Sequence, residues 1–223
     1  MTTGIICASD DELAPFLSFM EEFSVVRKST LKIYRGKIAG RSVAALYGGV
    51  GKINAAAATQ LLADKFRCDA IINAGTAGAL SDALKPFDTV AVVKTACYDA
   101  DEDLITQYHP FLPSIWLGAD KKLVERAEKA AQTFPSKVYF GAAVTGDRFI
   151  SDDRTRRNLA RTFNALCVDM ESAAVAQVCR VNKIPFIAVR TISDCADGES
   201  KNLFDANSES AAAVAARFVL TLL

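Results

Sequence analysis

The sequence has few of the residues that most often support metal-based or histidine-based catalysis. His109 is the only histidine among 223 residues, so histidine-ligated zinc sites and Ser-His or Cys-His catalytic pairs have almost no side chains available. The six cysteines are scattered without a C-x-x-C pair, mostly in apolar stretches where cysteine behaves as a small hydrophobic residue. We therefore expect reduced core thiols and catalysis that depends on carboxylates.

The chain also lacks features that direct proteins to nucleic acids or membranes. Lys plus Arg and Asp plus Glu each total 26, which leaves no net charge to attract nucleic acid or anionic lipid. No apolar run reaches the roughly 18 residues of a membrane span. The first residues, MTTGIICASDDE, have no basic region before their short apolar run, unlike a signal peptide. These absences predict a cytoplasmic protein with a small-molecule partner.

What is present is an alternation of apolar, β-branched runs with helix-like segments. The expected strands are residues 3–8, 31–39, 41–47, 69–74, 89–96, 137–144, 164–170 and 184–192. The expected helices are residues 10–22, 52–66, 120–133, 152–163, 171–182 and 207–222. This order predicts an α/β fold with a mostly parallel sheet between helices, and a hairpin at Ala39-Gly40 makes the sheet mixed. With no linker or repeat, residues 1–223 form a single domain.

Ligands in open α/β sheets collect beyond the carboxyl ends of strands. Five such ends are acidic or glycine-rich: SDDE (9–12), GGVGK (48–52), NAGTAGA (73–79), DMES (169–172) and ISDCAD (192–197). Carboxylates that converge on one sheet edge repel one another unless a cation, a proton or a ligand donor intervenes. Their convergence predicts a functional site.

Each of these segments also has a purely structural interpretation. Ser9 and Glu12 form an S-x-x-E capping box, in which Glu12 reaches back to the amide of Ser9. GGVGKINA fails both phosphate-loop templates, because Ile53 follows Lys52 and Asn54 replaces the third glycine. The NAGTAGA segment is either a tight turn or a place where backbone amides approach a ligand closely.

The acidic pairs at the later strand ends are similarly ambiguous. The position of Asp194 after a strand is also typical of an ordinary turn or helix-cap aspartate. Asp169 and Glu171 point the same way in an extended strand, but a change from strand to helix between them would separate their directions. One of the two carboxylates is then expected to be structural while the other faces a ligand.

Six segments together resemble the 5′-methylthioadenosine/S-adenosylhomocysteine nucleosidases of the nucleoside phosphorylase superfamily. They are GIICASDDEL, GGVGKINAA, IINAGTAGAL, TGDRFI, VDMESAAVAQVC and VRTISDCAD, and they match in order over nearly the whole chain. The resemblance implies a three-layer α/β/α fold, no metal or organic cofactor, and a homodimer. It also implies hydrolysis of the N-glycosidic bond of adenine 5′-thioribosides.

The resemblance also implies roles for individual residues. Glu12 matches the base that activates water, Asp194 the acid that protonates adenine N7, and Glu171 the carboxylate that holds the ribose hydroxyls. The other implied contacts are Ser193 beside Asp194, Met170 under the sugar, Phe149 on the purine, Ile150 at the adenine edge, Arg190 and Thr76 near the water and sugar, and Val50 and Phe204 around the 5′ substituent. Thr76 stands where this family more often has serine.

The match is weakest at the 5′ end of the implied substrate. Ser9 and Glu102 occupy positions that are usually apolar in the family, so Glu102 either faces water or pairs with a polar 5′ substituent. The alternatives for the substrate are then S-adenosylhomocysteine, aminodeoxyfutalosine or 5′-deoxyadenosine. The apolar segment HPFLPSIW (109–116) either packs on its own subunit or, as we prefer, forms a dimer contact that closes a neighbour's pocket.

The implied chemistry needs one acid and one base. Breaking an N-ribosyl bond develops positive charge on the sugar while the purine leaves, so we expect a raised pKa at Asp194 and an ionised Glu12. A phosphorylase would have to bring a phosphate dianion near Glu12. At about 4 Å and an effective dielectric near 20, that repulsion costs about 4 kcal/mol per unit charge, which favours water as the nucleophile. A phosphate-dependent phosphorylase and a non-catalytic purine-binding module remain the alternatives.

Overall fold

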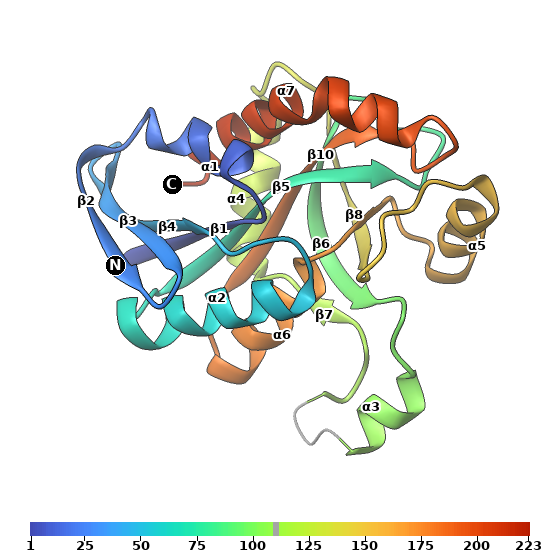
Figure 1. Ribbon diagram of the computed structural model, residues 1–223, viewed down its shortest axis with the longest axis horizontal. Coiled ribbons are helices and arrows are strands. Elements are labelled where there is room, and N and C mark those ends of the chain that lie inside the picture. The colour runs from blue at the N-terminus through green and yellow to red at the C-terminus, as the bar shows by residue number, and fades with distance from the viewer. Residues whose placement is uncertain (109–111) are drawn as a thin grey trace.

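The computed structural model describes residues 1–108 and 112–223, and these residues build one large sheet with helices on both faces (Figure 1). Within the described residues the strands are β1 Thr2–Cys7, β2 Glu21–Lys28, β3 Leu31–Ile38, β4 Arg41–Tyr47, β5 Ala70–Ala79, β6 Thr89–Cys97, β7 Leu117–Gly118, β8 Val138–Thr145, β9 Cys167–Asp169 and β10 Phe186–Asp194. The helices are α1 Asp10–Leu17, α2 Lys52–Phe66, α3 Glu102–Tyr108, α4 Lys121–Ala131, α5 Asp153–Phe163, α6 Ser172–Asn182 and α7 Ser200–Leu220.

The sheet is mixed, as predicted. β1 lies between β4 and β5 and is parallel to both, and β5 is also parallel to β10. β6, β8 and β9 form a second parallel group, which joins the first through antiparallel pairing of β10 with β6 and of β5 with β9. Because β1, β4, β5 and β10 run in one direction, their carboxyl ends meet at one edge of the sheet.

Two apolar layers flank the sheet, and the alternation of side chains along each strand separates them. Ile6 and Ile71 face the layer that contains the buried residues of α2 and α6. Their neighbours Ile5 and Ile72 face the opposite layer, which contains residues of α1, α4 and α7. A strand buried on both faces needs such a continuous apolar run, which explains the sequence pattern. The result is a three-layer α/β/α arrangement (Figure 1).

The predicted hairpin at Ala39-Gly40 is confirmed. β3 and β4 pair antiparallel, and the φ angles of Ala39 and Gly40 are 48° and 74°. Two consecutive residues with positive φ are typical of the tight turns whose twist matches that of the flanking strands.

Most predicted elements agree with the structure to within a few residues, but three predictions were wrong. The helix expected over residues 10–22 ends at Leu17, and residues 21–28 form β2, an exposed strand with too few buried positions to show an apolar pattern. The segment 73–79 lies inside β5 instead of following it, and α7 begins seven residues earlier than expected, at Ser200. The short elements α3 and β7 were not predicted.

The apolar segment 109–116 is partly described. His109, Pro110 and Phe111 lie outside the described residues. Leu112 is buried, and Trp116 packs edge-on against Phe163 under the ammonium group of Lys94. The described part of this segment therefore packs on its own subunit.

Two further expectations concern the cysteines and membrane-spanning helices. All six cysteines are free, four of them buried, as predicted for reduced core thiols. In the part of the chain that the structure describes, no helix is both long and apolar enough to cross a membrane.

Candidate active site

A cavity of about 280 Å³ opens where the carboxyl ends of β1, β4, β5, β9 and β10 meet. It brings together eleven of the thirteen predicted site residues: Ser9, Glu12, Val50, Thr76, Phe149, Ile150, Met170, Glu171, Ser193, Asp194 and Phe204. Arg190 contacts the backbone of Thr76 and the carboxylate of Glu171, two of the residues that line the cavity. Glu102 does not line the cavity; it is exposed at the start of α3, which projects from the body of the molecule (Figure 1).

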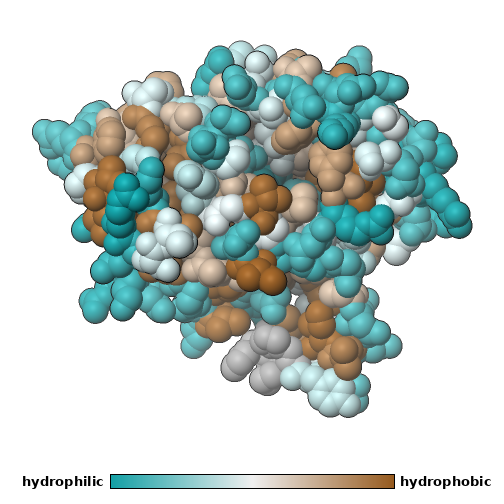
Figure 2. All heavy atoms as spheres, viewed as in Figure 1, coloured by the Kyte–Doolittle hydropathy of each residue, from teal (hydrophilic) through white to brown (hydrophobic). Residues whose placement is uncertain are grey.

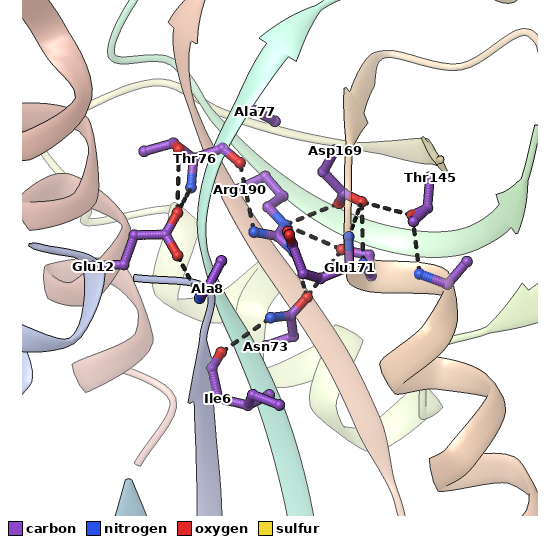
Figure 3. Close-up of polar contacts among 12 residues, drawn as sticks. Ile6, Ala8, Glu12, Asn73, Thr76, Ala77, Thr145, Asp169, Glu171 and Arg190 are labelled. Atoms are coloured by element: carbon purple, nitrogen blue, oxygen red, sulfur yellow. Dashed lines mark hydrogen bonds and ion pairs between the residues drawn. The ribbon is translucent and has the colours of Figure 1, made fainter. Parts of the chain in front are cut away.

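Glu12 is buried at the first turn of α1 and acts as a hydrogen-bond acceptor on both oxygens. Its Oε2 accepts from the amide of Ala8 at 2.8 Å, and its Oε1 accepts from the amide and hydroxyl of Thr76 at 2.8 and 3.1 Å (Figure 3). Ser9 caps the helix, as predicted, by accepting from the amide of Glu12 at 3.3 Å. The other half of the expected capping box was wrong, because Glu12 bonds to Ala8 and Thr76 instead of the Ser9 amide.

Gly75 explains how Glu12 fits against the sheet. A Cβ at this position would overlap Oε1 of Glu12 and lie 2.6 Å from Nη1 of Arg190. A glycine in β5 therefore leaves the space in which the carboxylate and the guanidinium approach the strand. The small residues of segment 73–79 therefore do not form a turn. They allow side chains from other elements to approach the backbone of β5 closely.

Asp169 and Glu171 diverge because the chain changes from strand to helix between them. Asp169 ends β9, and its Oδ1 accepts from Thr145 Oγ1 at 2.6 Å and from the amides of Glu171 and Ser172, both at 3.1 Å. It thus satisfies the free amides at the start of α6. Glu171 instead points into the cavity, where its Oε1 accepts from the amide of Gly51 at 2.9 Å.

A single buried cation, Arg190, links these carboxylates. Its Nε lies 2.9 Å from Oδ2 of Asp169, and its Nη2 lies 3.5 Å from Oε2 of Glu171. Figure 3 shows the guanidinium between Glu12 on one side and Asp169 and Glu171 on the other. Asp169 and Glu171 share one guanidinium, and Glu12 lies nearby. The negative charges of these carboxylates therefore exceed the single positive charge of Arg190.

The hydrogen bonds of Arg190 are completed by neutral groups beneath the cavity. Its Nη2 donates to Oδ1 of Asn73, and its Nε also lies 3.1 Å from Oγ of Ser172. Asn73 is itself anchored, because its Nδ2 donates to the backbone oxygen of Ile6 at 3.0 Å and its Oδ1 accepts from Ser172 Oγ. This network fixes Arg190, which lies on β10, from two other elements, β5 and α6.

Burial and the nearby negative charge raise the pKa of Glu171. Loss of solvent is the main cause that raises the pKa of Glu171 from 4.5 to about 7, and the nearby Asp169 raises it further. Arg190 and the amide of Gly51 act in the opposite direction. The free protein therefore keeps a proton on this carboxyl group to higher pH than an exposed glutamate would.

Asp194 lies at the end of β10 and lines the same cavity as Glu12. Its Oδ2 accepts from Ser193 Oγ at 2.8 Å, and its Oδ1 accepts from the amide of Ala196 at 2.9 Å. Burial raises the pKa of Asp194 above its usual value, although these two bonds partly oppose the effect. A raised pKa keeps a proton on the group to higher pH, as a general acid requires.

The aromatic side of the cavity is formed by Phe149 and Phe204. Their ring centroids lie 5.7 Å apart at 74°, an edge-to-face arrangement. Phe149 is 45% exposed, so much of its ring remains available to a ligand. Arg148 and Gly78 also line the cavity and were not predicted from the sequence.

The residues that sequence reasoning missed mostly act beneath the cavity. Asn73, Thr145 and Ser172 are fully buried polar residues inside or next to apolar runs. A buried polar residue needs a partner, so Asn73 within DAIINA was a usable signal. No group of histidine, cysteine or carboxylate side chains among residues 1–108 and 112–223 is arranged to hold a metal ion.

Comparisons with known proteins agree with this geometry. Residues 2–223 match the phosphorylase superfamily. A 5′-methylthioadenosine/S-adenosylhomocysteine nucleosidase of Staphylococcus aureus is 33% identical over 222 residues, which cover 98% of this chain and 97% of the relative.

Solved structures show the same fold. The structure of 5′-methylthioadenosine/S-adenosylhomocysteine nucleosidase from Neisseria meningitidis in complex with methylthio-immucillin-A has a TM-score of 0.93 at 34% identity, with 99% of this chain and 97% of that chain covered. The futalosine hydrolase of Helicobacter pylori has a TM-score of 0.92 at 27% identity, with 100% and 97% covered. The chain belongs to the 5′-methylthioadenosine/S-adenosylhomocysteine nucleosidase family of the phosphorylase superfamily, and it is a nucleosidase, a hydrolase of N-glycosidic bonds.

Proposed function

We propose that this enzyme hydrolyses 5′-methylthioadenosine and S-adenosylhomocysteine to adenine and the corresponding thioribose, with Glu12 as the base and Asp194 as the acid. The observation that carries this proposal is that both carboxylates line one cavity of about 280 Å³, together with Glu171. An acid and a base on one nucleoside are what cleavage of an N-ribosyl bond requires.

Glu12 takes a proton from the attacking water. Glu12 accepts hydrogen bonds from the amides of Ala8 and Thr76 and from the hydroxyl of Thr76. These donors are too weakly acidic to transfer a proton to the carboxylate, so they orient it and leave it able to act as a base. The hydroxyl of Thr76 is 3.1 Å from Oε1 and offers a second oxygen beside the water. Arg190 nearby stabilises the negative charge on Glu12 before proton transfer.

Asp194 delivers a proton to N7 of the departing adenine. Burial raises its pKa, so the protonated form persists to higher pH than for an exposed aspartate. Ser193 donates to Oδ2 and holds the side chain in one orientation. Protonated adenine is a much better leaving group than the adenine anion, so this step supplies a large part of the rate increase.

Glu171 holds the ribose, and an aromatic side chain holds the base. An ionised Glu171 can accept hydrogen bonds from both ribose hydroxyls, each worth about 1.5–3 kcal/mol because the acceptor is charged. Met170 lies under the sugar. Phe149 and the backbone of Ile150 form the adenine site, and Val50, Phe204 and Ser9 lie toward the 5′ substituent.

The test is adenine release from 5′-methylthioadenosine in buffer with and without phosphate. We expect release without phosphate, and phosphate-dependent release would identify a phosphorylase instead. Asp194→Asn and Glu12→Gln should each lower kcat by about 10²–10⁴-fold. Both amides preserve the size of the side chain, so the cavity keeps its shape and nucleoside binding should persist. A near-normal kcat in either variant would remove that residue from the mechanism.

The structural likeness to a futalosine hydrolase favours a second candidate substrate. Futalosine-type nucleosides carry a polar 5′ substituent, and Ser9 stands at a position of the cavity that is usually apolar in the family. A comparison of kcat/KM for 5′-methylthioadenosine, S-adenosylhomocysteine and aminodeoxyfutalosine decides between them. A preference of tenfold or more for the last would reassign the natural substrate.

We also propose that the enzyme is a homodimer and that Glu102 reaches the 5′ end of a site only in that assembly. Ile53, Leu104 and Tyr108 are 82%, 58% and 73% exposed, a large apolar area for a lone chain. Figure 2 shows hydrophobic surface over the projecting α3 segment. Sedimentation of a monomer would contradict the dimer, and an unchanged substrate ratio in Glu102→Val would remove Glu102 from substrate selection.

A further inference from the structure

Lys52, the last residue of the phosphate-loop-like segment GGVGK, forms ion pairs with two aspartates. Its Nζ lies 2.6 Å from Oδ1 of Asp99 and 3.7 Å from Oδ2 of Asp147. The lysine is therefore engaged by two carboxylates. Neither Lys52 nor the two aspartates line the nucleoside cavity.

Asp147 also supplies a cap that α2 lacks. The residue before the helix is Gly51, which has no side chain to accept from the first free amides. Oδ1 of Asp147, from the loop after β8, accepts from the amide of Lys52 at 2.8 Å. The amide of Asp147 in turn donates to Oδ2 of Asp99 at 3.2 Å, which joins the loop after β6 to the same cluster.

The amide next to this cap belongs to the nucleoside site. Gly51 donates to Oε1 of Glu171 at 2.9 Å, one residue before the amide that Asp147 accepts from. Gly51 has a φ of 97°, and a Cβ there would lie 3.1 Å from Oδ1 of Asp147. Two carboxylates, Glu171 and Asp147, therefore accept from adjacent amides of one segment.

The same cluster also lies next to the aromatic side of the site. Phe149 and Ile150 follow Asp147 by two and three residues, and Val50 precedes Gly51 by one. The ion pairs of Lys52 thus connect the loop under the purine to the loop beside the sugar. Both loops line the cavity, and no other ion pair among the described residues joins them.

We propose that Lys52, Asp99 and Asp147 are positioning residues, which hold the Gly51 amide against Glu171 and the Phe149 loop at a fixed distance from it. The inference rests on the proposed function for the roles of Glu171 and Phe149. The cluster acts on binding in the ground state and the transition state alike, because it orients the groups that hold sugar and base. Its loss should therefore raise KM more than it lowers kcat.

The experiment compares Lys52→Met, Asp99→Asn and the double variant with wild type, with 5′-methylthioadenosine as substrate. We expect KM to rise roughly tenfold in each single variant, about the effect of losing one charge-assisted hydrogen bond, with kcat within about threefold of wild type. The double variant should be little worse than either single variant, because both remove the same ion pair. Lys52→Arg should recover part of the loss. Lys137→Met removes an exposed lysine that stacks on Tyr139 and should change nothing.

Hydrogen exchange of the free protein provides a readout that does not depend on the substrate. Amides in residues 48–53 and 145–150 should exchange faster in Lys52→Met than in wild type and Lys137→Met. Unchanged exchange would overturn the proposal, and so would faster exchange with an unchanged KM. If wild type releases no adenine, the proposed function fails, while the exchange measurement still decides whether the cluster holds the two loops.

Discussion

Glu171→Gln should change how the stability of the enzyme depends on pH. Burial, with a smaller effect of the nearby Asp169, raises the pKa of Glu171 from 4.5 to about 7. At 1.36 kcal/mol per unit, this shift corresponds to about 3 kcal/mol. The residue is only 5% exposed, so solvent screening reduces this figure little.

The direction follows from which state binds the proton more tightly. Between pH 4.5 and about 7, the folded enzyme holds a proton on Glu171 that the unfolded chain has lost. The contribution of this group to the free energy of unfolding is therefore complete below pH 4.5 and is lost as the pH rises through about 7. Glutamine cannot ionise, so the variant lacks this dependence.

Equilibrium urea unfolding of wild type and Glu171→Gln, at pH values from 5 to 8, measures the effect. The stability of wild type relative to the variant should fall by about 2–3 kcal/mol over that range, because only wild type must ionise a buried carboxyl. Glu128→Gln, at an exposed position of α4, is the control and should show no such trend. A flat difference, or one that rises with pH, would refute the reasoning about the charge of the free site.

Two further predictions concern the framework around Glu12. Gly75→Ala should lower kcat at least about 100-fold, because its Cβ would displace both Glu12 and Arg190. A Cβ at Gly118 would have nothing within 4 Å, so Gly118→Ala should be neutral in the same assay. Equal activities of the two variants would show that β5 tolerates the added carbon. Phe16→Ala, in the fully buried core between α1 and the sheet, should lower the free energy of unfolding by about 3–5 kcal/mol in urea, and a loss below about 1 kcal/mol would mean that the site collapses around the deletion.

The parts of the fold that the sequence predicted are those where burial decides the residue type. The strands near the centre of the sheet, such as β1 and β10, contain the fully buried apolar runs GIIC and FIAV because helices cover both faces. β2 escaped prediction because all but one of its residues are exposed and its stability depends on pairing with β3, a contact far from any local pattern. α7 extends back to Ser200 through a mostly polar segment, which has no apolar periodicity to mark it as helical.

The candidate site was predicted at the level of its residues but not of its connections. Strand ends collect ligands, so Glu12, Glu171 and Asp194 were identifiable before their positions were known. That Glu12 would bond to Thr76, 64 residues away, or that Asp147 would cap α2 across 95 residues, is set by tertiary packing. Neither contact leaves a local pattern in the sequence.

The most direct test of the central claim is a crystal structure of Asp194→Asn with 5′-methylthioadenosine bound. The account predicts that adenine N7 lies within about 3 Å of the side chain at position 194 and that a water held by Glu12 faces the anomeric carbon. A nucleoside bound elsewhere, or one that leaves Glu12 and position 194 on the same side of the scissile bond, would contradict it.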